Sequence, residues 1–237
     1  DIYLSHSSSL AFWSSFEISS GALARFGIQK LLLAKRRTAA LECKVTELMI
    51  RELAGMPELE GIALPLHVVV PSQAARSRCG KVACHVSSAT FPRGSFIRIA
   101  RNVLASSPEL CFVQMANVLG LEKLIALGFE LCGTYDTWCD EIGECAPLTT
   151  VERLRAFTEN VGPVHGRKKA ARALQYVMGD SASPRETALA MLLCLPYRLG
   201  GYGIGAPRLN CRIDLGRRER RIAAGSISLR FVLAVRQ

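Results

Sequence analysis

The sequence predicts an α+β fold in which a small β-rich region is packed by helices. Three observations lead to this prediction. Nearly half of the 237 residues are apolar, which is enough for a sizeable core. Short runs rich in β-branched residues lie between residues 62 and 105, separated by Pro, Ser and Gly. Apolar residues recur at helical spacing before and after these runs, so helices should flank the strands.

Residues 1–60 are expected to form a helical N-terminal region. Ser5 can cap a helix that reaches Phe16. The segment GALARFGIQKLLLAKRR, residues 21–37, has Gly27 where a helix-turn-helix could bend. Many helix pairs break at a glycine, so an ordinary helical hairpin fits this segment as well.

Four runs in the next part of the chain predict strands. They are LHVVV (66–70), KVACHV (81–86), SFIRIA (95–100) and NVLASS (102–107). His67 and His85 lie within the first two runs. We expect each of them to be a packed, hydrogen-bonded histidine, because a lone histidine in a strand is more often structural than catalytic.

Helices return at Ser107. Ser107 can cap, Pro108 takes the first helical position, and Glu109 favours the positive end of the helix. Residues 121–131 predict a second helix from their apolar spacing. The acidic segment 132–147 contains Gly and Pro and predicts a loop or a domain boundary.

A basic helical segment follows this loop. Thr149 and Glu152 have the spacing of a capping box for a helix that ends at Phe157. Residues 167–177 then place small apolar side chains on one face of a helix. The other face carries three cations, Lys168, Lys169 and Arg172. That face is either a solvated surface or a surface that contacts phosphates.

The net charge of +10 is concentrated in the last third of the chain. Residues 1–60 and residues 61–150 each hold 7 Lys/Arg and 7 Asp/Glu, whereas residues 151–237 hold 16 and 6. A basic region of this kind is the electrostatic pattern expected for a nucleic-acid partner. A solvated basic surface without a partner is the alternative.

The nine cysteines are odd in number and lie mostly in apolar segments, which predicts a reducing, cytoplasmic location. Six residues could be combined into a zinc site, namely Cys79, Cys84, His85, Cys132, Cys139 and Cys145. No pair among them has the CxxC spacing that zinc ribbons favour, so free thiols are expected. The longest apolar run is too short to span a membrane, and the first residues do not resemble a signal peptide.

Glu186 raises the central functional question. Ser183, Pro184 and Glu186 form a capping-box pattern, in which the glutamate has only a structural role. Residues 188–195 are apolar on all sides of the helix, so we expect this helix to be buried. A carboxylate that faces a core must be hydrogen-bonded, paired or bound to a metal ion. The sequence therefore leaves a helix cap and a metal ligand as alternatives.

The order of these motifs resembles a known family. The motifs are LHVVV, SSPELCFVQMA, GRKKAARAL, SPRETALAMLLCLP and APRLNCRIDL, between residues 62 and 221. They are similar to actinobacterial proteins that join an AbiEi-type antitoxin-like region to an endonuclease domain of the very-short-patch-repair type, in the PD-(D/E)XK superfamily. The resemblance implies an AbiEi-like α+β region at 61–148. It also implies a basic helical segment followed by a partial α/β restriction-endonuclease-like core at 149–237.

The resemblance also implies catalytic positions. The family's acidic residue on the SPxE helix corresponds to Glu186, and an intact member would use Mg²⁺ to activate water. Asp214 is the nearest acid that could accompany it, although a structural role beside an arginine is the simpler expectation. No Asp or Glu follows Glu219. The chain is therefore expected to lack the metal-binding strands, to hold no cofactor and to be an incomplete, inactive copy.

Three hypotheses follow. The chain is an incomplete endonuclease-like protein of the defence or repair type, a non-catalytic DNA-binding or antitoxin-like regulator, or a degraded gene product without activity. The first two predict weak, salt-dependent binding of duplex DNA, no membrane association, and a toxin or defence partner that the sequence does not identify. The expected phosphate contacts are Lys168, Lys169, Arg172, Arg217, Arg218, Arg220 and Arg221.

Overall fold

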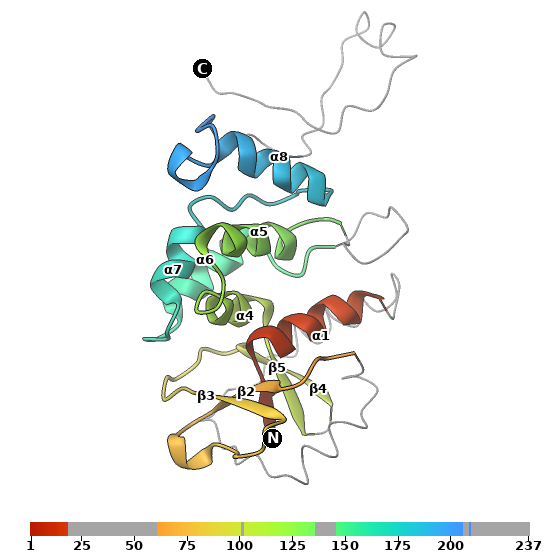
Figure 1. The fold of residues 1–237 in the computed structure, drawn as a ribbon, viewed down its shortest axis with the longest axis vertical. Helices are drawn as coiled ribbons and strands as arrows, with labels where there is room; N and C mark the ends of the chain where they lie inside the picture. Colours follow the sequence, from red (N-terminus) through yellow and green to blue (C-terminus); the bar gives the residue numbers. More distant parts are fainter. Residues whose placement is uncertain (19–60, 101, 136–145, 206–208, 210–237) are drawn as a thin grey trace, which may run out of the picture.

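A computed structural model describes residues 1–18, 61–100, 102–135, 146–205 and 209. The segment 21–37, with its predicted helix-turn-helix, lies outside these residues. The described part combines a five-stranded sheet at one end with helices stacked above it (Figure 1). This arrangement confirms the predicted α+β fold class.

The strands of the sheet are in the order β3-β2-β1-β5-β4. The central strand β1 (Ile2–Leu4) is antiparallel to β2 (Leu66–Val70) and parallel to β5 (Val103–Ser106). Strand β3 (Val82–Val86) runs parallel to β2, and β4 (Phe96–Ala100) runs antiparallel to β5. The four runs that predicted strands are thereby confirmed.

Strand β1 was not predicted, because three residues are too few to show the alternating pattern of a strand. All three of its residues are buried, and Leu4 has no exposed surface. The amide of Ile2 donates to the carbonyl of Asn102, and the amide of Ser5 donates to the carbonyl of His67. The N-terminal residues are therefore an integral part of the sheet formed by residues 66–106.

Six α-helices lie within the described residues, and Figure 1 shows α1 and α4 next to the sheet, with α5, α6 and α7 above them and α8 at the far end. Their bounds are α1 (His6–Ile18), α4 (Pro108–Met115), α5 (Leu121–Leu131), α6 (Val151–Asn160), α7 (Arg167–Ala173) and α8 (Pro184–Cys194). Two 3-10 helices are η2 (Gln73–Ala75) and η3 (Tyr197–Leu199). From residue 151 to 205 the described chain is helical and contains no strand.

The cap of α4 agrees with the sequence prediction, and the cap of α6 differs from it. Ser107 caps α4 by accepting from the amide of Leu110, as predicted. At α6 the predicted cap was Thr149, but Thr150 is the cap and accepts from the amide of Arg153 at 3.3 Å. Thr149 instead donates to Oε1 of Glu109 at 2.7 Å. The prediction of Thr149 as the cap was wrong, because the side chain of Thr149 is bonded to Glu109, 40 residues earlier, and Thr150 takes the cap position.

Two further helices differ from the prediction. Helix α7 ends at Ala173, although Leu174 and Val177 remain buried beyond its end. Helix α8 was expected to be buried on most sides, yet Thr187 and Ala190 are its buried residues. Leucines 189 and 192 on α8 are 39% and 47% exposed. The apolar sequence of α8 therefore did not predict its burial correctly.

The core consists of two clusters that meet between the sheet and the helical layers. The first cluster holds the inward residues of the sheet together with Phe12 and Trp13 of α1. The second joins α4, α5, α6, α7 and, through Ala190, α8. Leu148, Phe157 and Val164 pack against both clusters, so the sheet and the helices are continuous through their apolar side chains.

Candidate nucleic-acid interface

The basic helix α7 is positioned by a glycine that no other residue could replace without strain. Gly166 precedes the helix with a φ of +90°, which side chains rarely tolerate. A Cβ at this position would lie 2.4 Å from the carbonyl oxygen of Val113 in α4. Gly166 therefore lets the chain enter α7 directly against the end of α4.

Two of the cations on α7 are used to hold the helices together. Nε of Arg167 donates to the carbonyl of Thr158, and Nη2 of Arg167 donates to the carbonyl of Glu159, both at 2.9 Å. Nζ of Lys169 donates to the carbonyl of Leu119. Thr158 and Glu159 lie in the last turn of α6, where carbonyls lack partners within the helix, so Arg167 satisfies hydrogen bonds there and complements the helix dipole.

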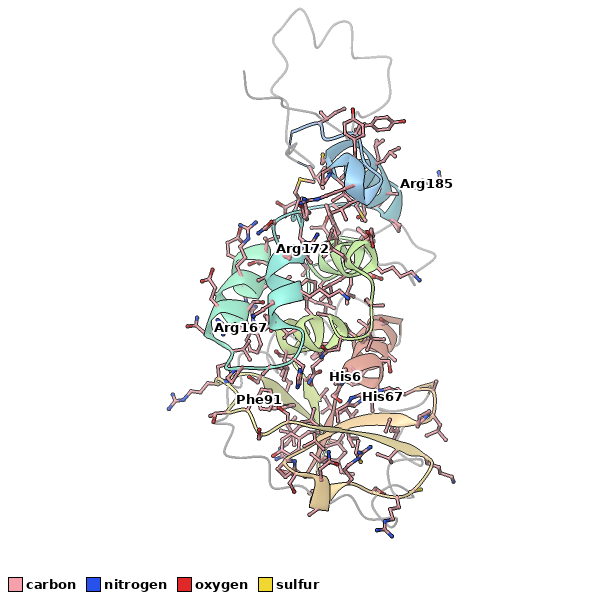
Figure 2. The ribbon with its side chains drawn as sticks, turned by 60° about the vertical axis from the view of Figure 1, so that its left-hand side comes forward. His6, His67, Phe91, Arg167, Arg172 and Arg185 are labelled. Carbon is pink, nitrogen blue, oxygen red and sulfur yellow. The ribbon has the colours of Figure 1, made fainter. Side chains whose placement is uncertain are left out.

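The neighbouring cations Lys168 and Arg172 are exposed and make no hydrogen bond or ion pair within the described part of the chain. Arg185, in the first turn of α8, is likewise exposed and without a partner there. Figure 2 labels Arg167, Arg172 and Arg185 on these helices. Lys168 and Arg172 are therefore the α7 cations available to a phosphate group.

Arg155 is a further cation near α7, and its position was not predicted from the sequence. It is exposed on α6, and its Nη2 donates to the carbonyl of Leu174, just beyond α7, at 3.2 Å. It lines a small groove of about 270 Å³ between α6 and α7, together with Thr158, Glu159, Ala171, Leu174 and Gln175. The contact of Arg155 with Leu174 depends on the packing of two helices, which sequence spacing alone does not reveal.

The charge of the described helical segment favours an anionic partner. Residues 151–205 contain eight Lys/Arg and four Asp/Glu. The four arginines expected to contact phosphate at positions 217, 218, 220 and 221 lie outside the described residues, as does Asp214. The structure therefore places Lys168, Lys169 and Arg172 together on α7, where Lys169 also donates to the carbonyl of Leu119 in the connection between α4 and α5.

Glu186 has the geometry of a capping box. Its backbone amide donates to Oγ of Ser183 at 3.1 Å, and its Oε2 accepts from the amide of Ala182 at 2.7 Å. The carboxylate thus binds one residue further back than the usual pattern, in which it would reach the amide of the cap itself. The bond from Ala182 gives the half-buried carboxylate a hydrogen-bond donor at the helix start.

The described residues contain no group of three or more His, Cys, Asp or Glu side chains arranged to hold a metal ion. Cys79 and Cys84, from the zinc site considered above, are free thiols in the sheet region. Cys132 is also free, and burial raises the pKa of its thiol to about 12. Burial likewise raises the pKa of the Cys111 thiol to about 12, so neither buried thiol is a nucleophile at neutral pH.

Three histidines meet where α1 joins the sheet. Nδ1 of His67 and Nε2 of His85 lie 2.9 Å apart, and the ring of His6 stacks on His85 with centroids separated by 3.7 Å. Nδ1 of His6 is 3.0 Å from Oγ of Ser5, and the amide of His6 donates to Oε1 of Gln114. Figure 2 shows His6 and His67 near this junction. The expectation of hydrogen-bonded strand histidines is confirmed for His67 and His85.

The protein environment favours the neutral form of all three imidazoles. Burial, with the neighbouring histidines, lowers the pKa of His6 to about 3. Burial, His67 and Arg76 lower the pKa of His85 to about 4, and burial also lowers the pKa of His67. No local pattern predicts that His6 joins this pair, because His6 lies 61 residues from His67 and at the start of a helix. The cluster is thus a structural junction between α1 and the sheet.

Comparisons of the chain with protein-family models, curated proteins and solved structures find no match. Among the described residues, no helix combines the length and apolar character needed to cross a membrane.

Proposed function

We propose that this protein is a DNA-associated protein of the defence or repair type, which binds duplex DNA without hydrolysing it. The observation that carries the proposal is the division of the cations on α7. Arg167 and Lys169 bind backbone carbonyls, whereas Lys168 and Arg172 are exposed and unpaired within the described residues. Cations that are not used by the fold are the ones available to phosphates.

The position of these cations supports contact with the DNA backbone. Gly166 fixes the entry into α7, and the bonds of Arg167 and Lys169 attach the helix to α6 and to the connection between α4 and α5. Lys168 and Arg172 therefore project from a helix whose backbone is held rigidly. Contacts of this kind position a protein on DNA and carry no sequence information, so weak binding with little sequence preference is expected.

The resemblance to endonuclease-like proteins supports an origin in defence or repair, and the capping bonds of Glu186 support the absence of hydrolysis. Metal-dependent hydrolysis of a phosphodiester uses several carboxylates around at least one ion. Glu186 is engaged with the amide of Ala182 instead. An antitoxin-like regulator remains the second hypothesis, and it shares the DNA-binding surface.

The proposal is tested by fluorescence anisotropy with a duplex of about 20 base pairs over a range of salt concentrations. Lys168→Gln and Arg172→Gln should each weaken binding and reduce the slope of log affinity against log salt by roughly 1. Lys123→Gln on α5 is the matched control and should leave both unchanged, because Lys123 is exposed but lies on a different helix. An affinity of the 237-residue protein for the duplex that does not change with salt would contradict the proposal.

A further inference from the structure

The segment that forms most of the sheet contains no acidic residue. Residues 61–107 hold six Lys/Arg and no Asp or Glu. Protein surfaces usually intersperse both signs of charge, so a stretch of 47 residues with a charge of +6 is unusual. Residues 61–150 as a whole hold equal numbers of Lys/Arg and Asp/Glu, but every Asp and Glu in that range lies at or beyond Glu109.

One cation of this segment is neutralised within the fold. Arg98 on β4 makes two bonds with the carboxylate of Asp1, at 3.0 and 3.2 Å. Three others lie close together in the connection between β2 and β3. We call this group, Arg76, Arg78 and Lys81, the β2–β3 cationic surface. All three residues are exposed.

The backbone of the β2–β3 connection is held by local bonds. The 3-10 helix η2 is closed by bonds from the amides of Ala75 and Arg76 to the carbonyls of Ser72 and Gln73. The amide of Ser77 donates to Sγ of Cys84 on β3 at 3.3 Å. The connection therefore presents its side chains from a defined backbone, which reduces the entropy lost on binding.

The cationic side chains, by contrast, make few bonds. Nη1 of Arg76 donates to Oε1 of Gln73 at 3.2 Å, a neutral partner that leaves the charge uncompensated. Arg78 and Lys81 make no side-chain bond within the described residues. Exposed Ser72 and Gln73 add neutral hydrogen-bonding groups of the kind that also contact phosphate oxygens. This combination matches the chemistry of a polyphosphate backbone.

The same segment lacks groups that would favour single strands. Its aromatic residues are Phe91 and Phe96, and both are buried, at 7% and 5% exposure. Recognition of single-stranded nucleic acid depends largely on exposed aromatic side chains that stack with bases. A surface with cations and no exposed aromatic ring contacts the backbone alone, and the closely spaced phosphates of a duplex suit it best.

We propose that the β2–β3 cationic surface is a second phosphate-contacting site for duplex nucleic acid, separate from α7. This inference rests on the proposed function, since it assumes the same class of partner. It adds that the sheet takes part in binding, and that contact through the sheet is independent of Lys168 and Arg172.

The test compares salt dependence in three single-charge variants. Anisotropy with a duplex of about 20 base pairs is measured for Arg78→Gln, Lys81→Gln and Lys168→Gln, with Lys123→Gln as the control. Arg78→Gln and Lys81→Gln should each lower the salt slope by roughly 1. Thermal unfolding of Arg78→Gln and Lys81→Gln should match that of the wild type, because neither side chain makes a bond to the residues that the structure describes. A single strand of the same length should bind more weakly than the duplex.

The outcomes distinguish the two proposals. If only Lys168→Gln lowers the salt slope, the β2–β3 cationic surface does not contact DNA and the proposed function is supported. If only Arg78→Gln and Lys81→Gln lower the slope, the β2–β3 cationic surface contacts DNA and α7 does not. If no variant changes the slope, both are wrong. Binding to vesicles of phosphatidylserine and phosphatidylcholine that duplex DNA does not compete with would also overturn the inference, in favour of a membrane surface.

Discussion

Nδ1 of His67 on β2 lies 2.9 Å from Nε2 of His85 on β3, and the ring of His6 stacks on His85. A hydrogen bond between two imidazole nitrogens requires one to donate and the other to accept, so at least one of the two rings must be neutral. The pair joins two parallel strands, and the stack joins them to the start of α1. Protonation should therefore weaken this junction.

The first prediction is a loss of stability in acid. The folded-state pKa values of His6 and His85, about 3 and 4, lie below the value of 6.5 expected in the unfolded chain. Between these values the unfolded chain binds more protons, so the free energy of unfolding falls as pH decreases. The contribution of the two neutral histidines to the free energy of unfolding is fully present above about pH 6.5, and it is lost progressively towards pH 4 and below. Thermal melting followed by circular dichroism from pH 8 to pH 4 measures it.

A matched pair of variants isolates the histidine contribution. His85→Gln should show a smaller decrease in melting temperature between pH 7 and pH 5 than the wild type, because it removes a histidine whose pKa is lowered in the folded state. His165→Gln should keep the wild-type dependence, because His165 is exposed in the connection between α6 and α7. An identical pH dependence in His85→Gln and the wild type would show that the cluster does not cause the effect.

The sequence predicted the elements whose signals are local. The runs at 66–70 and 95–100 became β2 and β4, because each carries its β-branched pattern within a few residues. Strand β1 has three residues and pairs with β5, which follows about 100 positions later. No local pattern can encode such pairing. The exposure of Leu192 was missed for a similar reason, since an apolar face does not specify which element covers it.

The candidate site could be predicted only in part. Charge counting located the basic region, and spacing placed Lys168 and Arg172 away from the apolar face of α7. Spacing did not reveal that Lys169 binds the carbonyl of Leu119, 50 residues earlier, or that Arg155 binds the carbonyl of Leu174. These bonds depend on the packing of helices. The acid-free character of residues 61–107 was present in the sequence but hidden by averaging over a longer window.

The second prediction concerns the buried carboxylate of Glu109. It accepts from Thr149 at 2.7 Å and from Nη2 of Arg153 at 3.0 Å, and so joins the start of α4 to the start of α6. Glu109→Ala should lower the free energy of unfolding by about 1–3 kcal/mol, because buried Thr149 loses its acceptor and Arg153 its partner. Urea unfolding measures this difference. Glu159→Ala removes an exposed carboxylate and should stay within about 0.5 kcal/mol of wild type. Equal effects of the two substitutions would contradict the structural role of Glu109.

The third prediction concerns Gly166. Gly166→Ala should destabilise the protein by about 2 kcal/mol or more, because the left-handed backbone costs about 1–2 kcal/mol for a non-glycine residue and the new Cβ meets the carbonyl of Val113. Gly200→Ala is the control. Gly200 has a similar φ of +80°, but a Cβ there has no atom within 4 Å. The difference in free energy of unfolding between the two variants measures the steric conflict with Val113 alone. A larger loss of stability in Gly200→Ala than in Gly166→Ala would contradict the close approach of α4 and α7.

The fourth prediction concerns the start of α8. Ser183→Ala should lower the free energy of unfolding by about 0.5–2 kcal/mol, because the amide of Glu186 loses its acceptor. Glu186→Gln should be nearly neutral, because the amide oxygen of glutamine can still accept from the amide of Ala182. Glu186→Ala should be modestly destabilising, because it removes that acceptor. Urea unfolding of the three variants tests this order.

The same variants decide between the cap and a metal ligand. A metal ligand would make Glu186→Gln deleterious to a metal-dependent reaction, whereas a cap predicts that glutamine serves equally well. Incubation of the protein with supercoiled plasmid and Mg²⁺ or Mn²⁺ should produce no more nicking than a heat-inactivated control. Nicking that Glu186→Gln abolishes without changing the unfolding transition would establish a catalytic glutamate and refute the structural assignment. Glutamine preserves the hydrogen bond to Ala182 but removes the charge that a metal ligand needs. A helix cap and a metal ligand at Glu186 therefore cannot give the same results in both urea unfolding and plasmid nicking.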